Sequence, residues 1–246
     1  STGGTAKFIE SLGINVTKVS EITNFPEIMD GRVKTLNPLI YGGILNRIGI
    51  DDDIQKEYGM INLDLMVINL YPFEKTISRN NADETDAIEN IDIGGPSMIR
   101  ASAKNFYNKA ILTDPEDYES LMVELKRNDC SVSETTRRNL AIQAFKKTAI
   151  YDSVIHDYLS SKVEKELLPH EIPLGLKKIT SLRYGENPHQ SAGLYVSNKK
   201  EDSLANAKIH QGKELSYNNY LDVNTAMNCV MEFVDPACVI VKHVNP

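Results

Sequence analysis

The sequence contains no tryptophan, only five histidines and three cysteines, and no apolar run near the ~20 residues of a membrane span. The cysteines, Cys130, Cys229 and Cys238, lack the spacing of a zinc site or a disulfide framework. We therefore expect no metal, and buried thiols in a reducing compartment, the cytoplasm. Basic residues are also in the minority, 27 against 34 acidic, so the formal net charge is −7. That balance argues against nucleic acid or an anionic membrane as the main partner.

What is present is ordinary for a globular protein. Hydrophobic residues make up 41% and charged residues 25% of the 246 positions, enough for one large domain or two smaller ones. The sequence begins directly on a turn motif and stops at residues 244–246, soon after an apolar run. We therefore expect the terminal parts of its domains to be missing.

The first part of the chain alternates between strand-like and helix-like segments. Asp114-Pro115 also suits a helix start, with Asp as the N-cap and Pro in the first turn. The alternation predicts an α/β fold with a parallel sheet, whose ligands bind at the carboxyl ends of the strands. The predicted helices are 5–12, 38–46 and 96–104, and the predicted strands are 14–19, 63–70 and 109–113.

A long helix over 133–160 is the clearest element, because its apolar residues recur every three or four positions. After it, charge mixed with Pro169, Pro173 and Gly175 predicts a linker. We expect a first domain over 1–165, a linker over 166–180 and a second domain over 181–246. The second domain should hold a strand at 193–196, a helix at 219–233 and a strand at 237–241.

Two short motifs favour an anion site. In Thr2-Gly3-Gly4-Thr5, the glycines allow close backbone approach, and free N–H groups at a helix start favour phosphate. The alternative is a plain turn before a Thr-capped helix. In Arg32-Val33-Lys34-Thr35, an extended backbone would put Arg32 and Lys34 on the same side, where both would suit a phosphate or an oxyanion. The alternative is a solvated basic stretch.

Two further motifs carry polar groups at strand and helix ends. Asn69 and Tyr71 close the most apolar strand, where Asn69 needs a partner and Tyr71 can bind a ligand or simply pack. Asp92-Ile93-Gly94-Gly95 can bind a substrate amine and an oxyanion, although an N-cap explains Asp92 equally well. Lys104 suits a helix C-terminus, where the helix dipole favours a cation. If it instead turned inward among Arg32 and Lys34, its pKa would fall and it could donate or accept a proton.

Two motifs fall in the second domain. Arg183-Tyr184-Gly185-Glu186-Asn187-Pro188-His189-Gln190 opens it. Lys242-His243 follows the apolar run 237–241. A strand that delivers both to its end would present a base beside a cation, and a strand that merely reaches the surface is the alternative.

These motifs, in this order, resemble the family of bifunctional purine-biosynthesis enzymes with AICAR transformylase and IMP cyclohydrolase activities. The resemblance implies a methylglyoxal-synthase-like α/β domain followed by the beginning of a cytidine-deaminase-like α/β domain. It implies formyl transfer from 10-formyltetrahydrofolate to AICAR and then dehydrative closure of formylated AICAR to IMP. Partners would be these phosphorylated purine precursors, folate and a second copy in a homodimer. No cofactor is implied in the cyclohydrolase domain.

The resemblance also implies roles for single residues. Catalytic roles fall on Lys34, Tyr71, Asp92 and Lys104 in the first domain, with Lys104 as proton donor or acceptor, and on Lys242 and His243 in the second. Nucleotide binding falls on Thr2, Gly3, Gly4, Thr5, Arg32, Val33, Thr35, Asn69, Ile93, Gly94, Gly95, Arg183, Tyr184 and Asn219. The sequence departs from the family at Asn37 and Tyr41, where histidines are usual.

Two other functions share the fold type. A nucleotide sensor needs the glycine-rich phosphate loop, but not Lys34, Tyr71, Asp92 and Lys104 together. A methylglyoxal synthase would carry its own acids and histidines and no second domain, so the motif at 183–190 counts against it.

Overall fold

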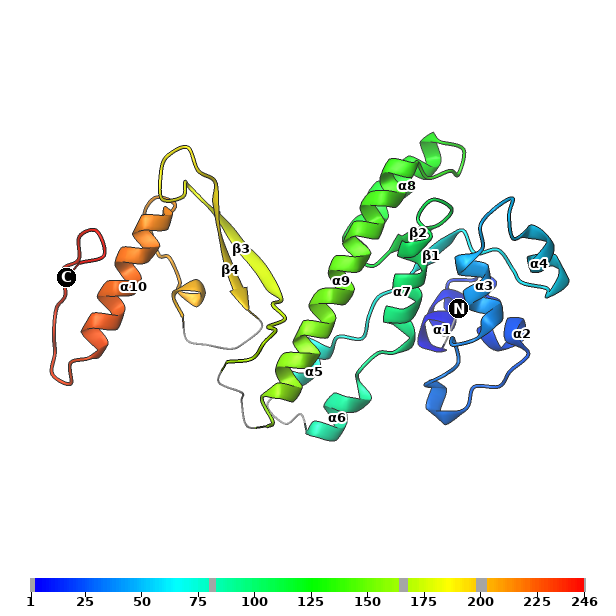
Figure 1. Ribbon diagram of the computed structural model, residues 1–246, viewed down its shortest axis with the longest axis horizontal. Coiled ribbons are helices and arrows are strands. Elements are labelled where there is room, and N and C mark those ends of the chain that lie inside the picture. Colours follow the sequence, from blue (N-terminus) through cyan, green and yellow to red (C-terminus); the bar gives the residue numbers. More distant parts are fainter. Residues whose placement is uncertain (1–2, 80–82, 164–167, 198–202, 246) are drawn as a thin grey trace. The chain divides into compact units, whose positions relative to one another are not determined.

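The computed structural model describes residues 3–79, 83–163, 168–197 and 203–245. The chain divides into two compact units, Ser1–Tyr158 and Leu159–Pro246, and each is described here by itself (Figure 1). The predicted α/β class is confirmed, because the first unit is mostly helical around one parallel strand pair.

The first unit surrounds its strand pair with helices (Figure 1). Several helix starts follow from local sequence: Asn37 caps α3 by accepting a hydrogen bond from the Leu39 amide at 2.9 Å, and Pro38 fits the first turn. The elements are α1 (Gly3–Ser11), α2 (Val19–Thr23), η1 (Met29–Gly31), α3 (Pro38–Leu45), α4 (Asp52–Glu57), β1 (Leu65–Val67), α5 (Phe73–Ile77), α6 (Glu84–Glu89), α7 (Gly94–Lys104), β2 (Ala110–Leu112), η2 (Pro115–Asp117), α8 (Tyr118–Arg127) and α9 (Glu134–Ser160).

Strands β1 and β2 are parallel, with Met66 opposite Ile111. The chain between them passes through α5, α6 and α7. A parallel crossover must return to the amino end of the sheet before the second strand begins. Helix α7 makes this return, so its first residue, Gly94, lies toward the carboxyl end of β1 and its last, Lys104, toward the amino end of β2.

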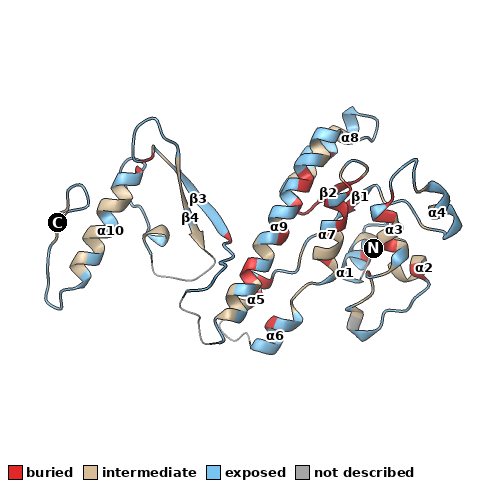
Figure 2. Cartoon of the chain, in the orientation of Figure 1, coloured by how far each residue is buried: buried red, intermediate tan, exposed pale blue. Residues whose placement is uncertain are grey.

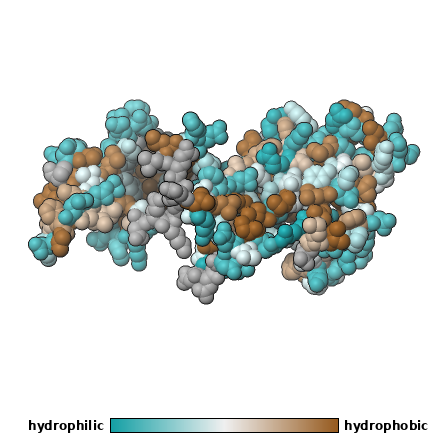
Figure 3. All heavy atoms as spheres, turned by 60° about the horizontal axis from the view of Figure 1, so that its bottom comes forward, coloured by the Kyte–Doolittle hydropathy of each residue, from teal (hydrophilic) through white to brown (hydrophobic). Residues whose placement is uncertain are grey.

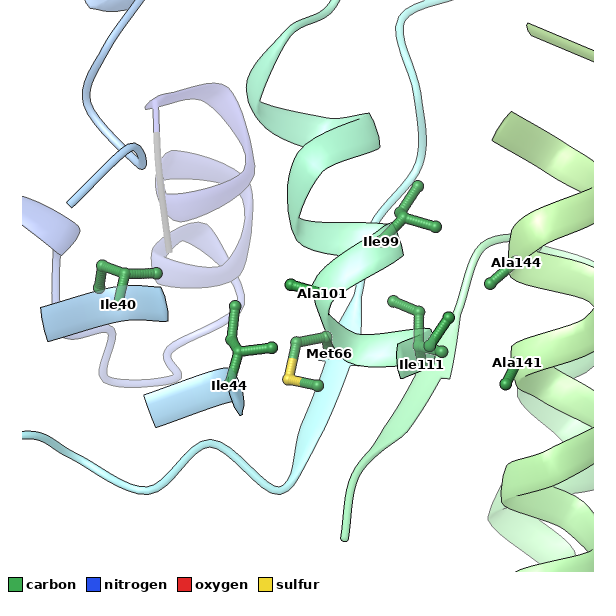
Figure 4. Packing of buried hydrophobic residues seen from close by; sticks show 9 residues of the cluster. Ile40, Ile44, Met66, Ile99, Ala101, Ile111, Ala141 and Ala144 are labelled. Atoms are coloured by element: carbon green, nitrogen blue, oxygen red, sulfur yellow. The ribbon is translucent and has the colours of Figure 1, made fainter. Parts of the chain in front are cut away.

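The main hydrophobic core lies between this strand pair and helices α3, α7 and α9 (Figure 4). Ile44, Ile99 and Ala144 are fully buried in it. Ala141 and Ala144 of α9 point toward α7 and β2, and their small side chains let the helix approach closely (Figure 4). A smaller cluster places Phe73 against α9 through Val154, and this contact fixes the start of α5.

A polar cluster closes the amino end of the strand pair. The Asn105 amide donates to the carbonyl oxygens of Ile44 and Asn46, at 2.9 and 2.8 Å. Lys109, fully buried just before β2, donates from Nζ to the Asn62 side chain. Burial lowers the pKa of Lys109, and the nearby Asp64 carboxylate partly offsets that effect.

The second unit contains the antiparallel pair β3 (Leu176–Leu182) and β4 (Ala192–Ser197), the short η3 (Leu204–Asn206) and helix α10 (Tyr217–Met231). Ser216 is its only buried polar side chain among the described residues, and α10 buries none of its side chains (Figure 2). Large apolar side chains are exposed in both units, and hydrophobic patches lie among hydrophilic ones on the face shown in Figure 3.

Several predicted elements are confirmed: the helices at 5–12, 38–46, 96–104 and 133–160, and the strands at 63–70 and 109–113, although both strands are shorter than predicted. The predicted strand at 193–196 and helix at 219–233 are also present as β4 and α10.

Two predicted strands are wrong, and one strand was not predicted. Residues 14–18 have no regular structure and are followed by α2, because no described strand pairs with them. The predicted linker contains β3 from Leu176 onward, a strand exposed on both faces that shows no apolar alternation. Residues 237–241 are irregular and Ile240 is 84% exposed, again without a partner strand in the described part of the chain.

The prediction of buried thiols is also wrong. Cys130 and Cys238 are exposed, and Cys229 is half-buried. Cys130 lies in the turn after α8 with φ of 59°, a left-handed conformation that turns favour and cores seldom contain.

Replacing Lys109 by Met tests the buried amine. Between the lowered pKa and the ordinary value of 10.5, the unfolded chain holds a proton that the folded chain has released, so wild-type stability gains as pH rises through this window. We expect Lys109→Met to be more stable than wild type at pH 7, by about 1 kcal/mol or more, and this advantage to be smaller at pH 10.5. Urea unfolding at both pH values measures it.

The matched control is Lys56→Met, which removes an exposed amine on α4. It should change stability little at either pH. If Lys109→Met is instead strongly destabilising at both pH values, the hydrogen bond to Asn62 outweighs the cost of burying the ammonium.

Candidate active site at two helix starts

The candidate site begins where Lys34 lies against the start of α1. Its Nζ is 3.4 Å from the position that a Cβ would occupy on Gly3, and equally close to that position on Gly31. Both glycines have positive φ, 41° and 81°, a conformation that other residues seldom adopt. The Lys34 side chain is only 21% exposed. The two glycines therefore leave room for a half-buried ammonium beside a helix N-terminus.

Residues 32–35 form a turn, not the extended segment that was predicted. Backbone amides of Lys34 and Leu36 donate to the carbonyls of Gly31 and Val33, which curls the segment. Arg32 and Lys34 accordingly pair with different carboxylates, Arg32 with Glu89 and Lys34 with Glu27 at 3.5 Å. The convergence of the two cations that alternation predicted is therefore absent.

Thr35 joins this turn to the start of α7. It is buried, and its Oγ1 lies 2.6 Å from the Cβ position of Gly94. A Cβ on Gly95 would lie 2.3 Å from Asp92 Oδ2 and 2.9 Å from Leu70 Cδ2. Glycine at both positions thus lets Thr35, Asp92 and Leu70 meet around the first turn of α7.

Asp92 fastens this turn in two ways. Its Oδ1 accepts a hydrogen bond from the Gly95 amide at 2.8 Å, so it stabilises the first turn of α7 from one residue before the N-cap position, Ile93. Its own amide donates to the Tyr151 hydroxyl of α9 at 2.8 Å. Ile93, beside it, is 57% exposed.

Asn69 and Tyr71 follow β1 rather than lying inside a buried strand. Asn69 is exposed and its amide donates to the Tyr118 hydroxyl at 2.9 Å, which supplies the partner that the sequence demanded. Tyr71 is 57% exposed. Leu70, between them, touches the Gly95 position, so this segment borders the start of α7.

Lys104 lies at the other end of α7. Ten residues separate it from Gly94, which at the helical rise corresponds to about 15 Å. It lines a hollow of about 350 Å³ together with Arg138, with Phe106 just after α7, and with Ile142 and Phe145 of α9. The structure therefore does not bring Lys104 to Lys34 within one chain.

The remaining first-unit candidates surround the start of α1. Thr2 lies outside the described residues. Gly4 and Thr5 are exposed in the first turn of α1, and Val33 is half-buried in the neighbouring turn.

In the second unit, Arg183 and Tyr184 form a stacked pair. The guanidinium lies 4.9 Å from the ring centroid and donates to the Tyr184 hydroxyl at 3.1 Å. This hydrogen bond, with one from Ser216, lowers the pKa of Tyr184. Asn219 forms a capping box with Ser216 at the start of α10. Nearby, a hollow of about 460 Å³ is lined by Glu186, Gln190 and Tyr217, among others.

Lys242 and His243 lie on a tight turn, not at a strand end. Lys242 and Asn245 exchange backbone hydrogen bonds of 2.9 and 3.2 Å, and His243 and Val244 between them have φ of 52° and 64°. The Val244 amide donates to Asp222 of α10 at 2.8 Å, which anchors this strained turn.

Together the first-unit groups suit an anion. Two helix starts, α1 and α7, border one turn that carries a half-buried ammonium and a hydroxyl. Free N–H groups at helix N-termini and their dipoles favour negative charge. No cluster of metal ligands occurs in the part of the chain that is described, and none of its helices is long and apolar enough to cross a membrane.

Comparison with known proteins decides the family. The sequence model of the AICARFT/IMPCHase bienzyme family matches residues 102–246, more than half of the chain. The chain belongs to this family. The model of the MGS-like domain matches residues 1–97, which contain the turn at 32–35 and the start of α7. Membership makes the chain an enzyme of the AICARFT/IMPCHase type with a role in purine biosynthesis.

Among solved structures, the crystal structure of ForH is similar to this chain, with a TM-score of 0.57 and 31% sequence identity. The similarity covers 64% of this chain and 83% of the ForH chain.

Sequence reasoning missed the acidic and phenolic partners of the site. Glu27 and Glu89 pair with the two cations, and Tyr151 holds the Asp92 amide. Tyr151 falls within the helix predicted at 133–160, to which the sequence assigned no site residue. A tyrosine on the buried face of a helix is a usable signal, because its hydroxyl needs a polar partner.

Two substitutions of Asp92 separate its capping role from its charge. Asp92→Asn keeps the Oδ1 acceptor for the Gly95 amide, so its thermal stability should stay near wild type. Asp92→Ala removes the acceptor and should cost about 1 kcal/mol. Equal stability of both variants in thermal unfolding would show that the cap contributes nothing.

Proposed function

We propose that the first unit closes formylated AICAR to IMP with loss of water, and that the second unit contributes AICAR contacts to formyl transfer from 10-formyltetrahydrofolate. Family membership supports the reaction class. We also propose that the enzyme works as a cytoplasmic homodimer.

The observation that carries the proposal is the meeting of three separate motifs in the first unit. Lys34 lies against Gly3 and Gly31, Thr35 lies against Gly94, and Asp92 and Leu70 meet at Gly95. A 5′-phosphate would bind at the N-terminus of α1, where Gly3, Gly4 and Thr5 provide the first turn. Val33 and Arg32 would border this nucleotide.

Ring closure requires one bond to form and one oxygen to leave. The carboxamide nitrogen attacks the formyl carbon and gives up one proton, and the formyl oxygen takes up negative charge and then that proton. The formamide nitrogen loses a second proton and forms a double bond to the formyl carbon, and the oxygen takes this second proton and leaves as water. Lys34 would stabilise that oxygen as charge develops, together with the Gly94 amide. The Asp92 carboxylate would accept a hydrogen bond from the attacking amide, and Asn69, Tyr71 and Ile93 would border the base. Holding both reacting groups together supplies much of the rate.

Both cations are already paired, which sets a condition for binding. An anionic substrate must draw Lys34 from Glu27, and Arg32 from Glu89. Both pairs are partly exposed, so each exchange costs little.

In the second unit, the proposal assigns AICAR contacts to Arg183, Tyr184 and Asn219. The lowered pKa of Tyr184 follows from the Arg183 hydrogen bond. Lys242 and His243 would act on the transferred formyl group, His243 as the base that takes the amine proton and Lys242 as the stabilising cation.

The direct test is conversion of formylated AICAR to IMP by the chain, followed by absorbance, with Lys34→Met beside it. We expect kcat/KM to fall about a hundredfold in Lys34→Met, because one donor to the developing oxyanion is lost. Lys56→Met should match wild type. If wild type binds IMP but does not convert the substrate, the first unit is a nucleotide sensor.

Lys104→Ala separates chemistry from binding. Its distance from the N-terminal end of α7 predicts that IMP affinity, measured by calorimetry, stays near wild type. If Lys104 transfers a proton during ring closure, turnover should fall by about a hundredfold or more. Equal losses of affinity and turnover would contradict a role confined to proton transfer.

A further inference from the structure

Tyr151 of α9 touches both loops that border the start of α7. Its hydroxyl accepts a hydrogen bond from the Asp92 amide at 2.8 Å and donates to the Asn90 carbonyl oxygen at 3.4 Å. Its ring meets the Phe73 ring edge-on, with centroids 6.3 Å apart. Phe73 is 1% exposed and lies two residues after Tyr71. One side chain therefore contacts both the Asp92 turn and the segment that carries Tyr71.

The chemistry of the hydroxyl suits this double contact. Burial raises the pKa of Tyr151, so the group stays a neutral hydroxyl at physiological pH. A neutral hydroxyl can accept from one backbone group and donate to another at the same time. The Asp92 amide lies just before the first turn of α7, where backbone amides have no partner within the helix. Removing the Tyr151 hydroxyl would therefore remove the hydrogen bond that this amide donates.

The support behind Tyr151 is rigid. It lies on α9, a helix of 27 residues, and belongs to the cluster that packs around buried Phe73, Ala87 and Val154. Tyr158, two turns later, meets the same Phe73 ring edge-on with centroids 5.7 Å apart. Phe73 is thus held by two rings of one helix, whereas the Asp92 turn is held to that helix through the Tyr151 hydroxyl.

We propose that Tyr151 is a positioning residue for ring closure. It holds the Asp92–Gly95 turn at a fixed position relative to the segment that carries Tyr71. It does not touch the reacting atoms; it acts through Asp92 and Phe73. The inference rests on the proposed cyclohydrolase function for its effect on rate, whereas its effect on the turn is independent of that function.

The matched test is Tyr151→Phe, which keeps the ring against Phe73 and removes only the hydroxyl. We expect the Asp92 and Gly95 amides to exchange with solvent about tenfold faster or more, as read by hydrogen exchange with NMR detection. We also expect kcat for ring closure to fall about tenfold to a hundredfold, because small displacements of reacting groups are costly. KM should change little, because the phosphate site at α1 is untouched.

Two further variants complete the design. Tyr58→Phe removes an exposed hydroxyl and should leave exchange and turnover unchanged. Phe73→Leu keeps the Tyr151 hydroxyl but loses the ring contact, so it should lower kcat without speeding exchange at Asp92 as much as Tyr151→Phe does.

The outcomes separate the two hypotheses. Faster amide exchange in Tyr151→Phe without ring closure even in wild type would support the positioning role and refute the proposed function. Ring closure in wild type, with exchange and kcat unchanged in Tyr151→Phe, would overturn the positioning role. A loss of kcat with unchanged exchange at Asp92 would also overturn it, because the turn would not have moved.

Discussion

The parallel pairing of β1 with β2 is the constraint on which the first unit depends. Because the two strands are parallel, the chain must return between them through α7, which runs antiparallel to both. The start of α7 therefore lies at the carboxyl ends of the strands and its end lies at their amino ends. Leu70, Thr35 and Asp92 therefore lie near Gly94, at the carboxyl end. Asn105 lies beside Lys104 at the amino end, where its side chain donates hydrogen bonds to the end of α3. The same geometry makes the carboxyl end of the strands suited to anion binding and places Lys104 at the opposite end.

The sequence predicted those elements whose signals are local. The Asn37 cap, the glycines at 94 and 95, and the long periodicity of α9 each depend on neighbouring residues, and each helix formed near its expected position. The failures share a cause: strands at 14–19 and 237–241 needed a partner strand, which apolar alternation alone does not supply. Strand β3 was missed for the converse reason, because it pairs with β4 while both its faces stay exposed.

The site residues named from the sequence remain predictions, and the structure brings only some of them together. Gly3, Lys34, Thr35, Asp92 and Gly94 come together, but the expected convergence of Arg32 with Lys34 rested on an extended backbone that is in fact a turn. Glu27 and Glu89 explain the difference, since each acid attracts one cation. The two acids thus partly neutralise the cations of the candidate anion site.

The Asp92 carboxylate is the point where structural and chemical demands conflict. One oxygen caps α7 through the Gly95 amide, and the other faces the Cβ position of that glycine. A carboxylate held this way has little freedom to follow a substrate, so the precision of its position must come from its backbone. That backbone is fixed by the Tyr151 hydroxyl, and Tyr151 is fixed in turn by its packing around Phe73. Through Tyr151, helix α9 therefore holds the Asp92 backbone of the candidate site.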